Sequence, residues 1–253
     1  MWHAFGYWMR RYRRTWRGTV VISVANPLLF LAGIGAGLGR LVDTHAPAQI
    51  AGVPYLAFFA PGLLAAACMQ TGFLEASGRV VAAAGWSGAY RTATTTPLGP
   101  DQIMGGHLLF IAFRVASSAA AFVVVMAAFG ASHGWWALAV VPAALLTGMA
   151  FAAPAAAWAV TVRQFRQVNT VFRFVILPLY FFSGTFFAVA QLPHWIQPVA
   201  YALPLWHGVE LCRTLSLGTA TWSGVALHVG YLLLLTVAGV LVARVTYRRR
   251  LHT

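Results

Sequence analysis

Long apolar stretches, separated by short polar segments that contain arginine, set the pattern of this chain. Six of these stretches are each about 20 residues or longer, which is enough for an α-helix to cross a bilayer. The predicted membrane spans are residues 19–39, 55–77, 103–129, 135–162, 171–189 and 222–245. The pattern therefore predicts an all-α integral membrane protein with one transmembrane domain over residues 1–253.

Two segments differ from a plain span. Residues 1–18 mix arginine with aromatic side chains that recur every three or four positions. This mixture predicts an amphipathic helix that lies in the headgroup layer. Residues 191–213 contain Pro193, Pro198 and Pro204, which would break a long helix. They predict two short helices that dip toward the membrane from outside and return, a re-entrant pair between spans five and six.

The composition supports a membrane location. The chain has 253 residues, of which 60% are hydrophobic and 8% are charged, whereas soluble domains carry roughly 25% charged residues. So little polar surface requires lipid to cover much of the protein. The net charge of +13 comes from 17 arginines, with no lysine, against four acids. Because the arginines flank apolar spans, we interpret this excess as membrane topology rather than nucleic-acid binding.

The arginines are distributed unequally between the two sides of the predicted membrane domain. Six crossings place both termini on the same side. That side receives every arginine except Arg40 and Arg213 on the other side and Arg114 within span three. Under the positive-inside rule, both termini are predicted to be cytoplasmic. The predicted location is a bacterial inner membrane.

No pattern of catalytic or metal-binding residues stands out in the sequence. A P-loop needs the lysine of GxxxxGK[ST], and this chain has none. The GxSxG, HExxH and CxxC motifs are also absent, and the two cysteines, Cys68 and Cys212, lie far apart in the sequence. We therefore expect no enzyme activity, metal or cofactor on this chain, so ATP-driven work would need ATP hydrolysis by a partner.

The chain resembles a known family over nearly its whole length, and two stretches carry the resemblance. The first runs from Glu75 through the Thr96-Pro97-Leu98 turn to Gly106, and the second runs from Leu177 to Arg213. The second stretch combines Ser-Gly, Leu-Pro and Pro-Leu pairs with a terminal arginine. The chain resembles the permease subunit of type-2 ABC exporters, in particular the branch that exports nodulation lipo-oligosaccharides and certain antibiotics. It departs from many relatives at Ala188, where they have a proline.

The resemblance implies a dimer of six-span permeases, homomeric or heteromeric, that works with two copies of a separate ABC ATPase. ATP and Mg²⁺ would then be bound by the ATPase. The loop at 89–102 would be a coupling element that docks on this partner. An ordinary helix-capping loop is the alternative for the same residues. The candidate coupling residues are Arg91, Thr96, Pro97, Leu98, Pro100 and Asp101.

Glu75 and Arg114 are ionisable residues in or near predicted spans. Such residues are costly in a membrane and are usually paired or functional. Arg114 lies about 17 Å into span three at 1.5 Å per residue. The two side chains could pair within one subunit. A structural salt bridge or snorkelling toward the interface is the alternative to a role in transport.

The segment after span five is the candidate outer gate. The resemblance implies that this region closes the outer end of the pathway. Glu210 and Arg213 are three residues apart on one predicted helix and can bond each other. The gate candidates are Ser183, Gly184, Pro193, Trp195, Pro204, Glu210 and Arg213. The candidates for lining the pathway are Phe181, Phe182, Phe186 and Phe187, for which a lipid-facing cluster is the alternative.

The expected function is export of an amphipathic or lipidic substrate: a glycolipid, lipid-linked glycan, polyketide or drug. Almost no charge is expected inside the spans, which suits such a cargo better than a bare ion. A membrane scaffold or assembly protein is the alternative. An ion channel would need rings of acids or a filter-like loop, which are not seen. The expected partners are the ATPase, a second permease and membrane lipids.

Overall fold

The computed structural model describes residues 1–34, 37, 53–85, 88–94, 96–131, 136–162 and 164–251. Within these residues the regular structure is helical throughout. The helices are α1 (Trp2–Gly33), α3 (Tyr55–Ala84), α4 (Ala89–Thr94), α5 (Pro100–Ala128), α6 (Trp136–Ala159), α7 (Phe165–Val171), η3 (Phe172–Ile176), α8 (Leu177–Phe182), η4 (Val189–Gln191), α9 (Gln197–Ala202), α10 (Pro204–Leu217) and α11 (Trp222–Leu251). The end of the predicted first span and the start of the predicted fourth lie outside the described residues.

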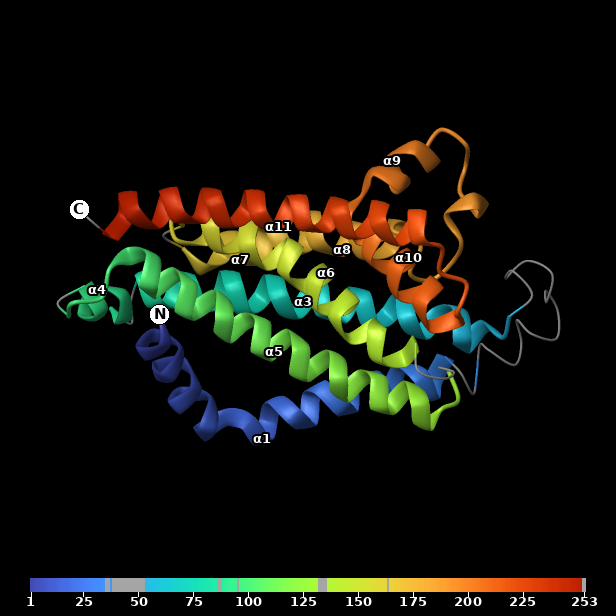
Figure 1. Ribbon diagram of the computed structural model, residues 1–253, viewed down its shortest axis with the longest axis horizontal. Helices are drawn as coiled ribbons and strands as arrows, with labels where there is room; N and C mark the ends of the chain where they lie inside the picture. Colours follow the sequence, from blue (N-terminus) through green and yellow to red (C-terminus); the bar gives the residue numbers. More distant parts are fainter. Residues whose placement is uncertain are drawn as a thin grey trace.

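The long helices run along the longest axis of the molecule (Figure 1). Both chain termini and α4 lie at one end of this bundle, called here the terminal end. The elements α9 and α10 lie toward the opposite end. Four helices among the described residues are long and apolar enough to cross a membrane, and a bent α1 would make five. The four are α3, α5, residues 138–159 of α6, and α11.

Helix α1 joins the predicted interfacial segment and the first span in one helix. Its two parts, Trp2–Gly18 and Ser23–Gly33, meet at an angle of 56°. The first part packs on α5 through Ala4, Trp8 and Tyr12, which are buried. Their spacing of four residues puts them on one face of the helix. The arginines of this part are exposed, so the segment is amphipathic as its sequence indicates.

Small residues let α6 approach its neighbours closely. A Cβ atom on Gly72 of α3 would lie 2.3 Å from the Gly148 carbonyl oxygen of α6. A Cβ on Gly208 of α10 would lie 2.4 Å from Thr147. Such small-residue contacts replace the missing hydrophobic driving force between helices in lipid. Helix α3 is central, because 78% of the residues in its most apolar stretch are buried inside the protein. Helix α11 is peripheral, because only 17% of the corresponding residues are buried.

Several helices continue beyond the apolar stretch that predicts them. Helix α3 extends past residue 77 to Ala84, and α11 extends past residue 245 to Leu251. Helix α3 ends only where Gly85 caps it. Hydropathy marks the part of a helix that suits lipid, whereas the helix itself continues until a residue stops it.

The predicted fifth span, residues 171–189, is wrong at its C-terminal end. The helical run there consists of α7, the π-helical turn η3 and α8, and it ends at Phe182. The π-helical turn directly precedes Pro178 near the start of α8, where proline removes a backbone donor. Gly184 then adopts φ +78°, a left-handed conformation that stops a right-handed helix.

Two helices, α9 and α10, cover most of residues 191–213 with a break at Leu203, and α10 continues past the predicted end of this segment to Leu217. Pro198 and Pro204 each lie in the first turn of their helix, where a missing N–H does no harm. Helix α10 packs against α3, α6 and α11. The prolines therefore start helices here and separate them from each other.

Candidate functional site

Arg213 of α10 is the centre of a buried polar cluster toward the opposite end of the bundle. Its side chain donates from Nη2 to the Gly184 carbonyl at 2.6 Å and from Nε to the Phe58 carbonyl at 3.2 Å. Its Nη1 lies 3.2 Å from Glu210 Oε2. The guanidinium also lies 3.8 Å from the centre of the Phe58 ring, within the range of a cation–π contact. Arg213 thus ties α10 both to α3 and to the loop after α8.

The loop over residues 183–187 is held at several points. Tyr55 of α3 donates from its hydroxyl to the Phe186 carbonyl at 3.1 Å. The buried hydroxyls of Ser183 and Thr185 lie 3.4 Å apart. Gly184 has a positive φ, and a Cβ there would lie 3.1 Å from Val189. The loop is therefore a fixed part of the fold.

Four predicted gate residues meet in this cluster, namely Ser183, Gly184, Glu210 and Arg213. The sequence did not indicate their partner on α3, because the Phe58 group that binds Arg213 is a backbone carbonyl. No side-chain pattern marks such an acceptor. An arginine in a segment with few charged residues was the available signal, since a buried guanidinium needs acceptors.

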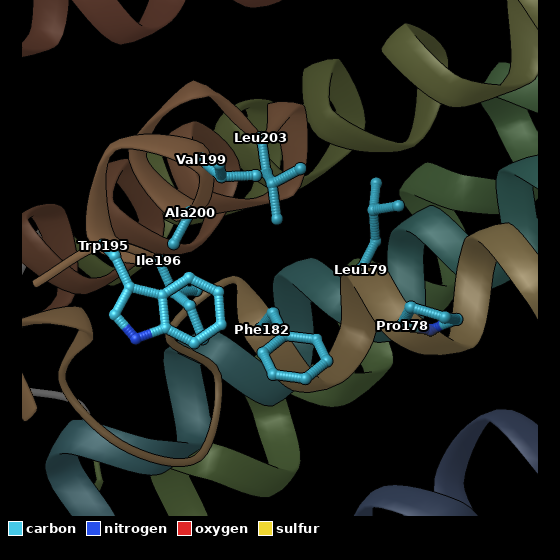
Figure 2. A pocket seen from close by; sticks show the side chains of 8 residues that line it. All are labelled: Pro178, Leu179, Phe182, Trp195, Ile196, Val199, Ala200 and Leu203. Carbon is cyan, nitrogen blue, oxygen red and sulfur yellow. The ribbon is translucent and has the colours of Figure 1, made fainter. Parts of the chain in front are cut away.

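The other predicted gate residues lie outside the Arg213 cluster. Pro204 lies in the first turn of α10, and Pro193 and Trp195 are exposed, Trp195 by 78%. Trp195 lines an apolar groove of about 340 Å³ between α8 and α9. Figure 2 shows α8 side chains on one side of this groove and side chains of the α9 region on the other. The lining residues are Pro178, Leu179, Phe182, Trp195, Ile196, Val199, Ala200 and Leu203.

The four predicted pathway phenylalanines do not share one surface. Phe182 is 45% exposed and lines the apolar groove. Phe186 faces the core, with its ring centre 5.5 Å from that of Phe59 on α3. Phe181 is half-exposed and stacks on Phe186 at 5.6 Å, and Phe187 is partly buried. Phe182 therefore contacts an open apolar groove.

Glu75 and Arg114 come together in the half of the bundle near the terminal end. Arg114 Nε lies 3.4 Å from Glu75 Oε1. Arg79, one turn further along α3, also pairs with Glu75. The Arg114 guanidinium lies 5.1 Å from the Tyr12 ring centre of α1, and Arg114 Nη1 lies 3.4 Å from the Tyr12 hydroxyl. This group joins α1, α3 and α5, and the sequence did not indicate Tyr12 as a member.

A second polar group anchors α4 at the terminal end. The Tyr90 hydroxyl lies 2.8 Å from His107 Nδ1 of α5 and 3.3 Å from the Tyr247 hydroxyl of α11. Trp8 of α1 stacks on the His107 ring, with 4.1 Å between ring centres. Burial and the neighbouring Tyr247 raise the pKa of Tyr90 well above its ordinary value, so its phenol stays neutral. Tyr90 therefore joins α4 to α5 and α11, and the His107 ring extends the group to α1.

The predicted coupling residues fall into two environments. Thr96 and Pro97 form an exposed turn between α4 and α5, with Leu98 half-buried behind it. Arg91 lies in α4, and its side chain lies outside the described residues. Pro100 and Asp101 begin α5. The Asp101 carboxylate accepts from Arg248 Nε at 2.9 Å and from Arg244 Nε at 3.2 Å, so it joins α5 to α11.

The described residues contain no group of three or more His, Cys, Asp or Glu side chains that could hold a metal ion. The nearest arrangement is a pair, His207 of α10 and His228 of α11, with 2.9 Å between their Nδ1 atoms. Two imidazoles at this distance can share a hydrogen bond, and they join the two helices.

Comparison with known proteins adds a family to this geometry. The family model of the ABC-2 type transporter matches residues 5–217, from α1 to the end of α10. Nodulation protein J of Rhizobium leguminosarum bv. viciae is 31% identical over 96% of this chain and 93% of the relative. The protein of the same name from Rhizobium meliloti (strain 1021) is 30% identical over 99% and 94%. That from Rhizobium leguminosarum bv. trifolii is 33% identical over 96% and 92%.

Proposed function

The chain belongs to the ABC-2 type transporter family, and from this membership we propose that it is the transmembrane subunit of an ATP-driven exporter for an amphipathic or lipidic substrate. Proteins of this family are membrane subunits of transporters and normally work with an ABC ATPase partner. In this proposal the partner supplies ATP hydrolysis, and this chain supplies the path across the membrane.

The position of α4 carries the proposal. This short helix and the exposed turn at residues 96–99 project at the terminal end, beside both chain termini (Figure 1). Tyr90 connects α4 to α5 and α11 through His107 and Tyr247. A force applied to α4 would therefore be passed directly to two long helices. A docking element for a motor protein needs this combination of exposure and rigid connection.

The charge distribution supports an orientation with the terminal end in the cytoplasm. Five arginines of α1 and three at the end of α11 belong to this end, whereas Arg213 lies toward the other. A bacterial inner membrane with both termini inside satisfies the positive-inside rule. In this orientation α9 and α10 lie toward the outer face, where they would form the re-entrant pair. Helices α7 and α8 would complete the sixth crossing.

The lining of the α8–α9 groove supports an amphipathic cargo. Its eight lining residues carry no charge, and Phe182 and Trp195 offer large apolar surfaces. Among the residues whose side chains are described, the buried arginines are Arg114 and Arg213, and each is paired with a carboxylate. The apolar part of a glycolipid, lipid-linked glycan, polyketide or drug would pass along this groove, and a second permease subunit would complete the pathway.

The proposal is tested by transport in inverted inner-membrane vesicles that contain this chain and its ATPase. Candidate glycolipids and lipophilic drugs with a fluorescent label should accumulate in the vesicles when ATP is added. Accumulation should stop when the P-loop lysine of the ATPase is replaced by alanine. Accumulation that continues unchanged with the inactive ATPase would reject an ATP-driven exporter.

A further inference from the structure

A cavity of about 440 Å³ lies between α1 and α4 at the terminal end. Its wall is formed by both helices, the turn after α4 and the start of α5. The lining residues are His3, Ala4, Tyr7, Trp8, Arg10, Ala89, Tyr90, Thr92, Ala93, Thr96, Leu98 and Ile103. Most of this surface is apolar, and His3 and Arg10 are exposed side chains at its edge. The cavity thus combines an apolar interior with a basic rim.

The positive charge beside the cavity is not neutralised by the described part of the protein. Five arginines lie on α1 between residues 10 and 17, and all of them are exposed. The three acids among the described residues pair with arginines outside α1: Glu75 with Arg79 and Arg114, Asp101 with Arg244 and Arg248, and Glu210 with Arg213. The charge of α1 therefore calls for an anion from outside these residues.

We propose that this cavity binds an anionic phospholipid of the inner leaflet. Its phosphate would lie between Arg10 and His3, and its glycerol and upper acyl chain would enter between Ala4 and Ala93. Basic clusters beside a membrane helix attract anionic headgroups, and an apolar cavity next to the cluster accepts the chain that a soluble anion lacks. The inference uses the proposed function only to place this end at the inner leaflet.

The lipid would act on the same segment that we propose to couple to the ATPase. Tyr90 and Trp8 form part of the cavity wall and also contact His107. A lipid in the cavity therefore fills the space between α1 and α4 and holds α4 in its packed position. This gives a physical route by which the lipid composition of the membrane would control coupling.

The test is lipid binding by the purified full-length chain, measured by native mass spectrometry. After removal of lipid, the protein is titrated with dioleoyl phosphatidylglycerol or with dioleoyl phosphatidylcholine. We expect one phosphatidylglycerol to bind more tightly than phosphatidylcholine. Arg10→Gln should weaken phosphatidylglycerol binding by about fivefold, the effect of one basic side chain near an anionic headgroup. Ala93→Phe should weaken it by filling the cavity.

Arg14→Gln is the matched control, because Arg14 is exposed on the same helix and does not line the cavity. Equal binding of the two lipids would overturn the proposal, because it would show no preference for an anionic headgroup. Equal losses in Arg10→Gln and Arg14→Gln would overturn it in favour of diffuse charge attraction. Unchanged lipid binding in Arg10→Gln together with weaker ATPase association would assign the surface to the protein partner instead. Selective lipid binding by a chain that recruits no ATPase would keep this inference and reject the proposed function.

Discussion

Arg213 gives the sharpest prediction about the buried polar cluster that its side chain forms. Arg213→Ala leaves the carbonyls of Gly184 and Phe58 without their charged donor, at a site where Arg213 is only 7% exposed. Each buried acceptor left unsatisfied costs about 1–3 kcal/mol. The lost contact with the Phe58 ring adds about 1 kcal/mol. The ion pair with Glu210 adds little, because that carboxylate is 30% exposed and is screened by water.

The expected loss from the two unsatisfied acceptors and the lost ring contact is therefore about 3–7 kcal/mol. At roughly 2–4 °C per kcal/mol for a chain of this size, the apparent Tm should fall on the order of 10 °C. The assay is thermal unfolding in detergent with a thiol-reactive fluorescent dye. It suits this chain because Cys68 and Cys212 are both buried and free in the folded protein. The dye would react with them only after the helices separate.

Two variants separate the carbonyl contacts from the charge. Glu210→Gln removes the ion pair and should lower stability by less than about 1 kcal/mol. Arg213→Lys keeps the charge but lacks the planar fork that reaches Gly184 and Phe58 at once, so it should fall between wild type and Arg213→Ala. An Arg213→Ala protein whose Tm lies within 2 °C of wild type, as a rough limit, would refute this reasoning. A Glu210→Gln loss equal to that of Arg213→Ala would show that the ion pair dominates.

Three further predictions concern other parts of the molecule. Glu75→Gln should destabilise the protein by about 3 kcal/mol because it leaves Arg114 buried without its carboxylate. A double Glu75→Gln, Arg114→Gln variant should lose less stability than the sum of the two single changes. Additive losses in the same dye assay would argue against pairing. Replacing Arg91 and Leu98 together should leave the protein in the membrane but abolish its stimulation of the ATPase, and unchanged transport would reject a coupling role for this turn. Gly148→Leu should reduce the folded yield in detergent sharply, because overpacking at a close helix crossing costs about 1–3 kcal/mol or more; normal yield would contradict the tight α3–α6 contact.

The long apolar helices were the easiest part of the fold to predict. Helices α3, α5, α6 and α11 correspond to stretches whose hydropathy alone suits a bilayer. Their contacts with one another are harder to derive from the sequence. The Gly72–Gly148 approach depends on two glycines on different helices, and either one alone looks like an unremarkable small residue. Packing of this kind becomes visible only when the helices are placed together.

The fifth span shows where hydropathy misleads. Residues 171–189 are mostly apolar on both sides of Phe182, but the helix ends at that residue. What ends it is the backbone of Gly184, with its positive φ, together with the hydrogen bond from Arg213 that holds the loop. Hydropathy is insensitive to both features. The Ser183-Gly184 pair was recognised as a motif, but the sequence alone did not indicate that it marks a helix end.

The sequence identified several side chains of the candidate site, but it did not identify the groups of the chain that bind them. Arg213 and Glu210 were recognised because charge is rare in this chain. Asp101 was predicted as a coupling residue, and the sequence did not indicate its bonds to Arg244 and Arg248 of α11. These partners lie more than a hundred residues away in the sequence. A short motif can identify an unusual residue, whereas its partner depends on how distant helices meet.

The central claim is that this chain works as a membrane subunit powered by a separate ATPase. The most direct test is purification of the tagged chain from its native membrane in mild detergent, followed by identification of the proteins that accompany it. We expect an ABC ATPase with its own P-loop, in about equal copies with this chain, and vanadate-sensitive ATP hydrolysis in the complex. Recovery of the chain alone as a dimer, with no nucleotide-binding partner, would contradict the claim and favour a scaffold role.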